Sequence, residues 1–279
     1  MDFKRIQIAL IISFLLFDIY LIFMLFARIN TISTYNATAR NLTIEQELSA
    51  RGISYPKLKS DSQEVPYVVA SKNNYLAANI GQLSNQNASV DGEGTLTSTF
   101  DEPVKLNLNL NDQTTGLSEE DRTLLTNNYL SDPEMFIGGQ YYRNFWYVNS
   151  QRTIYIRMTA YDGNPITDGT AEIQINLDEN YNMVGYIQTF QADITALKQK
   201  SRMITEREAI EVIDRRAETL IPDGSQIHYS VFTYYRSQEL DKFNVYSPAW
   251  QVVYDNQNGR YTITVDAIRG TVIQRRQIS

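Results

Sequence analysis

The sequence predicts an α+β protein that a single N-terminal helix anchors in a membrane. Three observations lead to this prediction. Residues 6–27 are almost entirely apolar, segments rich in β-branched and aromatic residues recur between turn signals, and Ser/Thr-led capping boxes mark the starts of short helices. We therefore expect an external body of antiparallel sheets packed by a few helices.

The apolar run at 6–27 has the length of a membrane span. About 22 residues form a helix of roughly 33 Å, which crosses a bilayer core. Lys4 and Arg5 precede the run and favour a cytoplasmic N-terminus, with the body on the outer face of the cell membrane. An uncleaved signal anchor is favoured over a cleaved signal peptide, because the small-x-small triplet at 37–39 lies about ten residues beyond the run.

Asp18 is the unexpected residue of this span. A carboxylate at mid-bilayer depth costs about 2.5–3.5 kcal/mol, so it favours protonation or a polar partner on another helix. Gln7 lies about three helical turns earlier, on nearly the same face. The candidate helix-contact residues on this face are Gln7, Ile11, Phe14, Asp18, Leu21 and Leu25. The alternative is that Asp18 is merely tolerated in a helix that only tethers the body.

The pattern of polar and apolar residues divides the rest of the chain into segments. Residues 1–5 form a cytoplasmic tip, and the polar residues 28–42 form a stalk. We expect a first external α+β domain at 43–135 and a second at 136–279, since long strand-like segments begin near Gln140.

The expected elements of the first domain alternate between helix and strand. The Thr43/Gln46 pair resembles a capping box of a short helix that ends at Gly52, and Ser118 is the expected N-cap of a helix that runs to about Leu130. The acidic residues after Ser118 suit the first turn of that helix better than a catalytic cluster. Between the helices we expect a strand from Tyr67, an Asn- and Gly-rich loop at 81–94, and strands at 95–100 and 104–110.

The second domain begins with an antiparallel meander. Its expected strands lie at 141–148, 153–161, 170–177 and 182–190. Their tyrosines are expected to pack the sheet against a helix rather than to stack on a ligand. A helix then begins at Thr205, which forms the best capping box in the chain, and extends towards Ile221. Further strands are expected at 226–235, 249–255, 260–267 and 271–276.

Composition and motifs offer little support for catalysis. The net charge of −7 argues against nucleic-acid binding, and the absence of cysteine leaves the single histidine, His228, without partners for an ordinary zinc site. His228 is expected to be structural. We find no phosphate-binding loop, nucleophile elbow or calcium loop, and we predict no enzyme activity, cofactor or metal. A distant pair of carboxylates remains open, because spacing cannot reveal such a pair.

Several segments together resemble the YycI (WalI) family of Gram-positive bacteria. They are the opening MDFKRIQIALIISFLLFDIYL, the segment EQELSARGISYP, and a C-terminal region with Thr205-Glu-x-Glu-Ala209, Pro248-Ala-Trp250 and Tyr261–Val272. The C-terminal region, at about 203–276, also resembles a PepSY-type helix-and-sheet unit. The resemblance spans most of the chain and is weakest around 80–135.

This resemblance implies a regulatory role. YycI proteins are accessory proteins of the YycG/YycF (WalK/WalR) two-component system, which governs cell-wall metabolism. They associate with the sensor histidine kinase and with the similar protein YycH, and they carry no catalytic residues. The resemblance thus implies contact with the kinase through the membrane helix, and with a YycH-like partner through the helix and the external body. The alternative is an extracellular ligand-binding or protease-inhibiting module of PepSY type.

Overall fold

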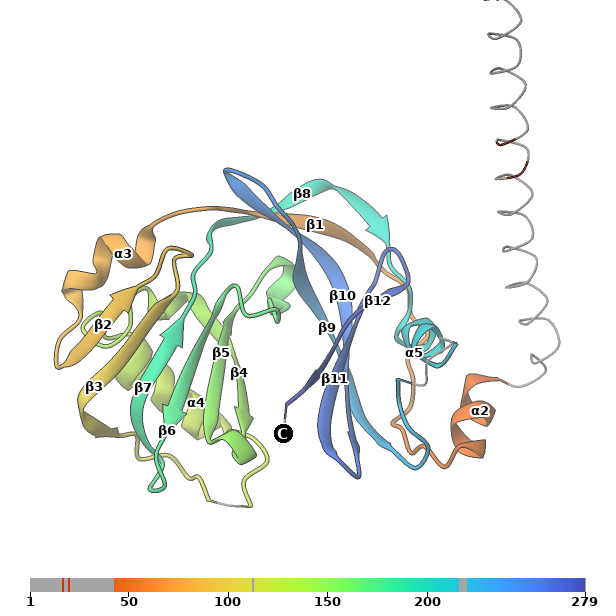
Figure 1. Cartoon of the computed structure of the whole chain (residues 1–279), viewed down its shortest axis with the longest axis horizontal. Coiled ribbons are helices and arrows are strands. Elements are labelled where there is room, and N and C mark those ends of the chain that lie inside the picture. Colours follow the sequence, from red (N-terminus) through yellow and green to blue (C-terminus); the bar gives the residue numbers. More distant parts are fainter. Residues whose placement is uncertain (1–16, 18–19, 21–42, 112, 216–219, 279) are drawn as a thin grey trace, which may run out of the picture. The chain divides into compact units, whose positions relative to one another are not determined.

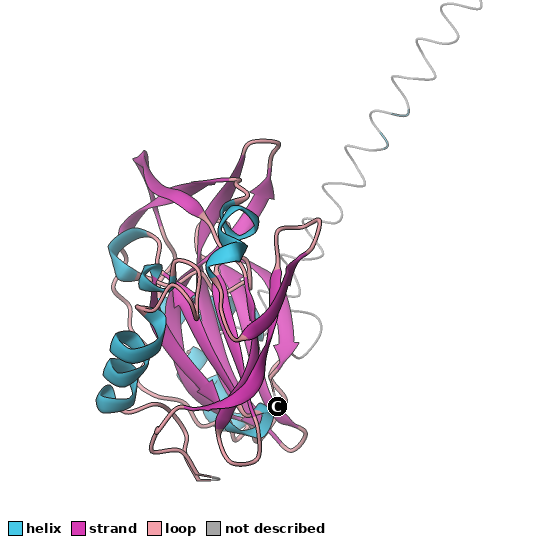
Figure 2. Ribbon diagram, turned by 90° about the vertical axis from the view of Figure 1, so that its left-hand side faces the viewer, coloured by secondary structure: helices cyan, strands magenta, loops and turns pink. Residues whose placement is uncertain are grey.

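The computed structural model describes residues 17, 20, 43–111, 113–215 and 220–278. The chain forms two compact units, residues 1–51 and 52–279. Strands predominate over helices in the described residues (Figure 2). The expected class, antiparallel sheets with a few helices, is confirmed.

Among the described residues of the first unit, Ile44–Ala50 form helix α2. Thr43 Oγ1 accepts a hydrogen bond from the Gln46 N–H, and the Gln46 side chain accepts one from the Thr43 N–H at 2.9 Å. These two bonds form a capping box, so the expectation from the sequence is confirmed. Gly52, with φ +67°, follows the C-cap Arg51 and stops the helix.

The described part of the second unit contains two antiparallel sheets of six strands each. The strands are β1 (Glu64–Ser71), β2 (Gln86–Val90), β3 (Leu96–Lys105), β4 (Tyr142–Val148), β5 (Thr153–Met158), β6 (Glu172–Leu177), β7 (Asn182–Gln188), β8 (Ala192–Arg202), β9 (Gln226–Glu239), β10 (Phe243–Asn256), β11 (Gly259–Asp266) and β12 (Thr271–Gln277).

Sheet A is built around β10. Strand β9 pairs along one side of β10, whereas β1 and β11 share the other side, at residues 243–246 and 249–256 respectively. Strand β12 pairs with β11, and β8 pairs with β1. Strands β1 and β8 lie side by side and carry the chain between the two sheets (Figure 1).

Sheet B has the order β2-β3-β7-β6-β5-β4. Strands β4 to β7 form the expected meander, with successive antiparallel pairs. The hairpin β2–β3 is added to it through pairing of β3 with β7. A short contact also links the sheets, because Tyr234 of β9 donates its N–H to the Pro165 carbonyl in the β5–β6 connection.

Helices cover parts of both sheets. Helix α4 (Glu119–Leu125) continues as a π-helical turn, η2 (Thr126–Leu130), and it lies behind sheet B in Figure 1. Helix α5 (Glu206–Asp214) packs on β10, β11 and β12. The remaining short helices are α3 (Tyr75–Asn79), η1 (Ile80–Gln82), η3 (Gly139–Tyr141), η4 (Asn149–Gln151) and η5 (Tyr161–Gly163).

The N-cap residues of α4 and α5 are the ones that the sequence predicted. Ser118 caps α4 with Asp121 as its reciprocal partner, and Thr205 caps α5 with Glu208. The acidic residues after Ser118 therefore include a capping carboxylate, as expected. The predicted extension of α5 towards Ile221 falls partly on residues outside the described range, and the described helix ends at Asp214.

One hydrophobic core joins the two sheets. It includes Val68 and Tyr246 of sheet A together with Ile154, Ile173 and Tyr186 of sheet B, all almost fully buried. Tyr142 and Tyr147 are buried in the same core, so these tyrosines pack the sheet as predicted. This shared core agrees with the grouping of residues 52–279 into one compact unit.

The two sheets do not follow the domain boundary predicted after residue 135. Sheet B takes β2 and β3 from before this point and β4 to β7 from after it, and β1 belongs to sheet A. No break between sheets coincides with residue 135. The physical reason is long-range pairing, which a local change in residue pattern does not reveal.

Three local expectations need correction. The segment 81–94, expected to be a loop, contains β2, whose polar residues are accommodated because β2 is an edge strand. The two strands expected at 95–100 and 104–110 are one strand, β3, followed by irregular chain. Asn107 adopts φ +53° there, which interrupts the alternating Leu-Asn pattern. Strand β8 was not foreseen, because its sequence, ADITALKQKSR, is polar and exposed.

Candidate functional site

The helix-contact residues expected from the sequence lie outside the described residues. They are Gln7, Ile11, Phe14, Asp18, Leu21 and Leu25. Of the predicted span only Phe17 and Tyr20 are described; both are helical and exposed. Within the described part of the chain, no helix has the length and apolar character needed to cross a membrane.

In the body, a buried ion pair lies on sheet B. Arg157 of β5 pairs with Glu172 of β6, with 3.0 Å between Nε and Oε2 and side chains only 8% and 4% exposed. The second carboxylate oxygen of Glu172 accepts a hydrogen bond of 2.6 Å from Gln174. The guanidinium of Arg157 also lies 4.8 Å from the ring centre of Trp146. Each charge of the pair therefore has compensating contacts.

This ion pair belongs to the face of sheet B that points away from the α4-covered core. Alternation along β5 places Tyr155 and Arg157 on that face, whereas Ile154 and Ile156 point into the core. Burial raises the pKa of Tyr155, and the positive charges of Arg157 and of Arg276 in β12 oppose the increase. Burial likewise raises the pKa of Tyr229 in β9, with Arg260 and Arg157 opposing. A tyrosine of each sheet therefore lies within electrostatic range of an arginine of the other sheet.

A cavity of about 310 Å³ lies over the polar face of sheet A. Its lining includes Gln251, Thr262 and Thr264 of the sheet, together with Thr167 and Asp168 of the β5–β6 connection. Nearby, Tyr235 donates its hydroxyl to Asp266 Oδ2 at 2.7 Å. Burial and this carboxylate raise the pKa of Tyr235 well above its ordinary value. The tyrosine therefore serves as a neutral hydrogen-bond donor, not as a base.

A second cavity, of about 370 Å³, lies where the sheets join. Its lining combines the β2–β3 turn with Lys72 after β1, Phe190 and Gln191 before β8, and Arg236, Glu239 and Asn244 of the β9–β10 hairpin. Asn244 is 2% exposed. Glu239 accepts from Lys72 at 2.7 Å and from Arg236 at 3.0 Å, and these cations lower its pKa.

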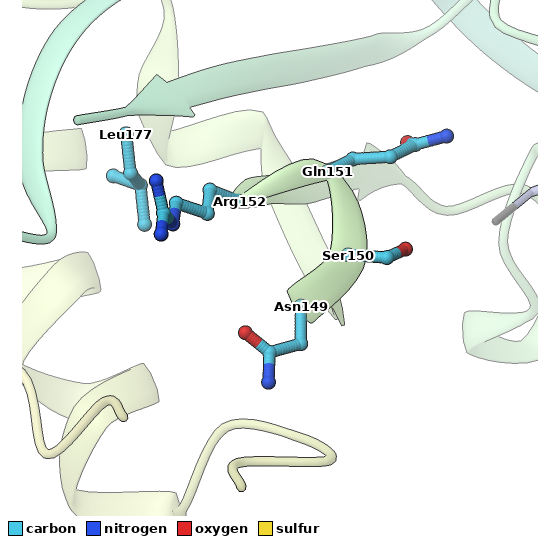
Figure 3. A pocket seen from close by; sticks show the side chains of 5 residues that line it. All are labelled: Asn149, Ser150, Gln151, Arg152 and Leu177. Carbon is cyan, nitrogen blue, oxygen red and sulfur yellow. The ribbon is translucent and has the colours of Figure 1, made fainter. Parts of the chain in front are cut away.

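A shallower pocket surrounds the β4–β5 turn. Figure 3 shows Arg152 beside Leu177, while Asn149 and Ser150 point away from Leu177. Arg152 adopts φ +47° and closes the turn by donating its N–H to the Asn149 carbonyl. The pocket is polar and open.

The only histidine, His228, lies in a surface cluster with Asp255 and Arg260. Its Nε2 lies 2.7 Å from Asp255 Oδ2, and Asp255 also receives two hydrogen bonds from Arg260, at 2.7 and 2.9 Å. These bonds, above all that of Arg260, lower the pKa of Asp255. The three residues lie on neighbouring strands β9, β10 and β11, so the contacts are consistent with the structural role predicted for His228.

The described residues contain no group of three histidine, cysteine or acidic side chains that could hold a metal ion. The cavities offer hydrogen-bond donors, acceptors and paired charges, which suit recognition of a small polar molecule. The sequence did not reveal these sites, because their residues come from distant segments.

Comparison with protein families matches residues 32–268 to the family described as YycI protein. The chain belongs to the YycI family. The match covers sheet B and all of sheet A except β12, and it begins before α2. The resemblance inferred from the sequence is therefore confirmed, including for the region around 80–135 where it was weakest.

Two solved structures resemble this YycI chain at low sequence identity. None of the curated proteins matches it. An uncharacterised protein from Eubacterium rectale is 10% identical, with a TM-score of 0.44, over 80% of this chain and 90% of that chain. The Bacillus megaterium YpeB C-terminal domain is also 10% identical, with a TM-score of 0.35, over 86% of this chain and 100% of that chain.

Proposed function

We propose that this YycI chain is a membrane-anchored, non-enzymatic regulator that associates with a sensor histidine kinase and a YycH-like protein and modulates the kinase in cell-wall homeostasis. The observation that carries the proposal is the family match over residues 32–268. The predicted span at 6–27 adds a route by which an external body can act on a membrane kinase.

The proposed contact with the kinase is the polar stripe of the span. A helix with Gln7 and Asp18 on one face gains from packing against a helix that offers hydrogen-bonding groups, since lipid offers none. The external body pairs with the YycH-like protein and sets the orientation of this helix. To alter kinase activity, the complex must bind one signalling state more tightly than the other, because equal affinity would shift no equilibrium.

The test is replacement of Asp18 by leucine in a strain that reports kinase output. We expect output to change while protein level and export remain unchanged, because the stripe loses its central polar group. Ser13→Leu is the matched control, since Ser13 lies about 140° around the helix from Asp18. Unchanged output from Asp18→Leu, with the partner complex intact, would refute the stripe as the contact.

Ligand binding by the body is a second candidate function, which the two cavities of about 310 and 370 Å³ favour. Exchange of residues 6–27 for an unrelated membrane helix distinguishes a function of the body from a function of the span. Regulation that survives the exchange would assign the function to the body, and regulation that is lost would assign it to the span.

A further inference from the structure

Polar side chains without protein partners gather around the cavity of about 310 Å³ over sheet A. Gln251, Thr262 and Thr264 line it and are only 8%, 5% and 8% exposed. No other described residue forms a hydrogen bond with the side chain of any of the three. Buried polar groups are normally paired, because an unpaired one is costly. These side chains therefore point to a molecule in the cavity that bonds to them.

The polar atoms of these three side chains can be reached from the cavity. None of them is among the unpartnered side-chain atoms that are cut off from the surface. Gln251 lies directly opposite Thr264 in the β10–β11 pair, and opposed residues of neighbouring strands project from the same face. Thr262, two residues before Thr264, shares that face. The amide and both hydroxyl groups therefore project into one space, the cavity that all three residues line.

An arginine without a counter-ion lies on the β12 side of the cavity. Arg276 is opposite Thr262 in the β11–β12 pair and lines the cavity. Its Nε and Nη2 each lie 3.2 Å from the side-chain oxygen of Gln274 when that amide is oriented to accept. This partner is neutral, and Arg276 forms no ion pair with any described residue. Its charge is therefore open to an anionic group.

The other charged side chains of the lining already have partners. Arg236 pairs with Glu239 at 3.0 Å. Asp168 accepts from the Thr170 hydroxyl at 2.6 Å and from the Arg236 N–H. Asp168 is thus bonded to β9, whereas Arg276 lies three strands away on β12, about 14 Å across the sheet. An anionic group beside Arg276 is therefore remote from the Asp168 carboxylate.

The chemistry of the free groups defines the ligand. An amide and two hydroxyls can each donate and accept, so they match a molecule with several hydroxyl groups. The cation at the β12 side matches one negative charge on that molecule. A volume of about 310 Å³ is at the small end of ligand pockets, which suits one ring rather than a longer chain.

From these features we propose that the cavity binds a saccharide unit that bears a carboxylate. Its hydroxyl groups exchange hydrogen bonds with the side chains of Gln251, Thr262 and Thr264, and its carboxylate is held by Arg276. The proposal gives a site and a ligand class to ligand binding by the body, the second candidate function on which it rests. It does not depend on contact with a kinase.

The test is binding of defined probes to the full chain in detergent or nanodiscs, by calorimetry and by saturation-transfer NMR. The probes are D-glucuronate and D-galacturonate. D-glucose and D-galactose, which lack the carboxylate, and cyclohexanecarboxylate, which lacks the hydroxyl groups, are the probe controls. We expect saturable binding of at least one sugar acid, with the control probes weaker by 10-fold or more.

Two variants locate the site without loss of a hydrogen bond between described residues. Thr264→Val and Gln251→Leu remove the unpartnered polar groups and keep the side chains close to their original size. We expect each to weaken sugar-acid binding at least 10-fold and to melt no lower than the unmodified chain. Thr99→Val is the matched control, because Thr99 is exposed on β3 and does not line the cavity. It should bind as the unmodified chain does.

A third variant tests the contact with the carboxylate. Arg276→Met should weaken binding of the sugar acids at least 10-fold and leave the weaker binding of D-glucose unchanged. Arg275→Met is the matched control for charge, since the adjacent Arg275 projects from the opposite face, where its Nε donates to the Tyr254 hydroxyl at 2.8 Å.

The proposal is overturned if neither sugar acid binds, a result that would assign the cavity to solvent. It is equally overturned if Thr264→Val and Gln251→Leu, shown to be folded by their melting transitions, bind as tightly as Thr99→Val. Equal affinity for D-glucuronate and D-glucose would refute the role of Arg276. Kinase output, in the Asp18→Leu strain and after the helix exchange, is measured separately from binding, so failure of either proposal does not decide the other.

Discussion

Arg157 and Glu172 face each other across adjacent strands as a directly opposed pair, in a place where both side chains are almost completely buried. The carboxylate is completed by Gln174 and the guanidinium by the Trp146 ring. Both charges of this pair, on the polar face of sheet B, are therefore compensated. Both side chains are already removed from water. Replacement of one partner therefore leaves a buried charge without a counter-charge, which costs far more than replacement of both partners by apolar side chains.

Glu172→Gln should therefore lower the free energy of unfolding by about 3–5 kcal/mol, because it leaves the Arg157 charge buried without a counter-charge. The double variant Arg157→Met with Glu172→Leu should lose much less. Urea denaturation followed by circular dichroism measures both. Equal destabilisation in the single and double variants would show that packing, rather than the unpaired charge, governs this site.

Asp255 should stabilise the folded protein in a pH-dependent manner. Its pKa is lower in the folded protein than the ordinary value of 3.8, mainly because Arg260 donates to it. The charged carboxylate thus stabilises the folded state above about pH 4, and this contribution is lost as the pH falls through the lowered pKa.

The measurement is the stability of the unmodified chain and of Asp255→Asn between pH 7 and pH 2.5. The difference between them should be largest near neutrality and should shrink below pH 4. Asp101→Asn, at an exposed aspartate, is the control. A difference that grows on acidification would contradict the assigned direction.

Gly139 should not tolerate a side chain. A Cβ at this position would lie 2.2 Å from the Leu130 carbonyl oxygen and 2.9 Å from its carbon, so the backbone after η2 would have to move. We expect Gly139→Ala to cost about 1–3 kcal/mol, as overpacking in a core does. Gly116→Ala, where a Cβ meets no atom within 4 Å, should be close to neutral in the same melting experiment.

Thr205→Ala should remove about 1 kcal/mol of stability, because the Glu208 N–H then loses its 3.1 Å acceptor at the start of α5. Thr205→Ser keeps the hydroxyl and is the matched control. Melting temperatures of the two variants measure the effect. A Thr205→Ser variant as unstable as Thr205→Ala would point to the methyl group instead of the cap.

The elements that the sequence predicted well are those with local causes. Thr43, Ser118 and Thr205 each form a capping box within four residues of chain, and the β4–β7 meander is marked by turn residues between aromatic strands. Strand β8 and the polar strand β2 escaped prediction, because their conformation comes from pairing with β1 and β3. The cavity around Asn244 escaped it too, since its walls come from five separate segments.

By itself, the sequence determined the class of the fold, because capping and alternation are local properties of the chain. It also indicated the family by resemblance and predicted a membrane span. Only the tertiary structure decided that residues from before and after position 135 share sheet B. It alone also showed that Arg157 meets Glu172 and that Asn244 is buried beside a cavity with charges of both signs. These relationships arise from contacts between residues far apart in sequence, which packing and strand pairing bring together.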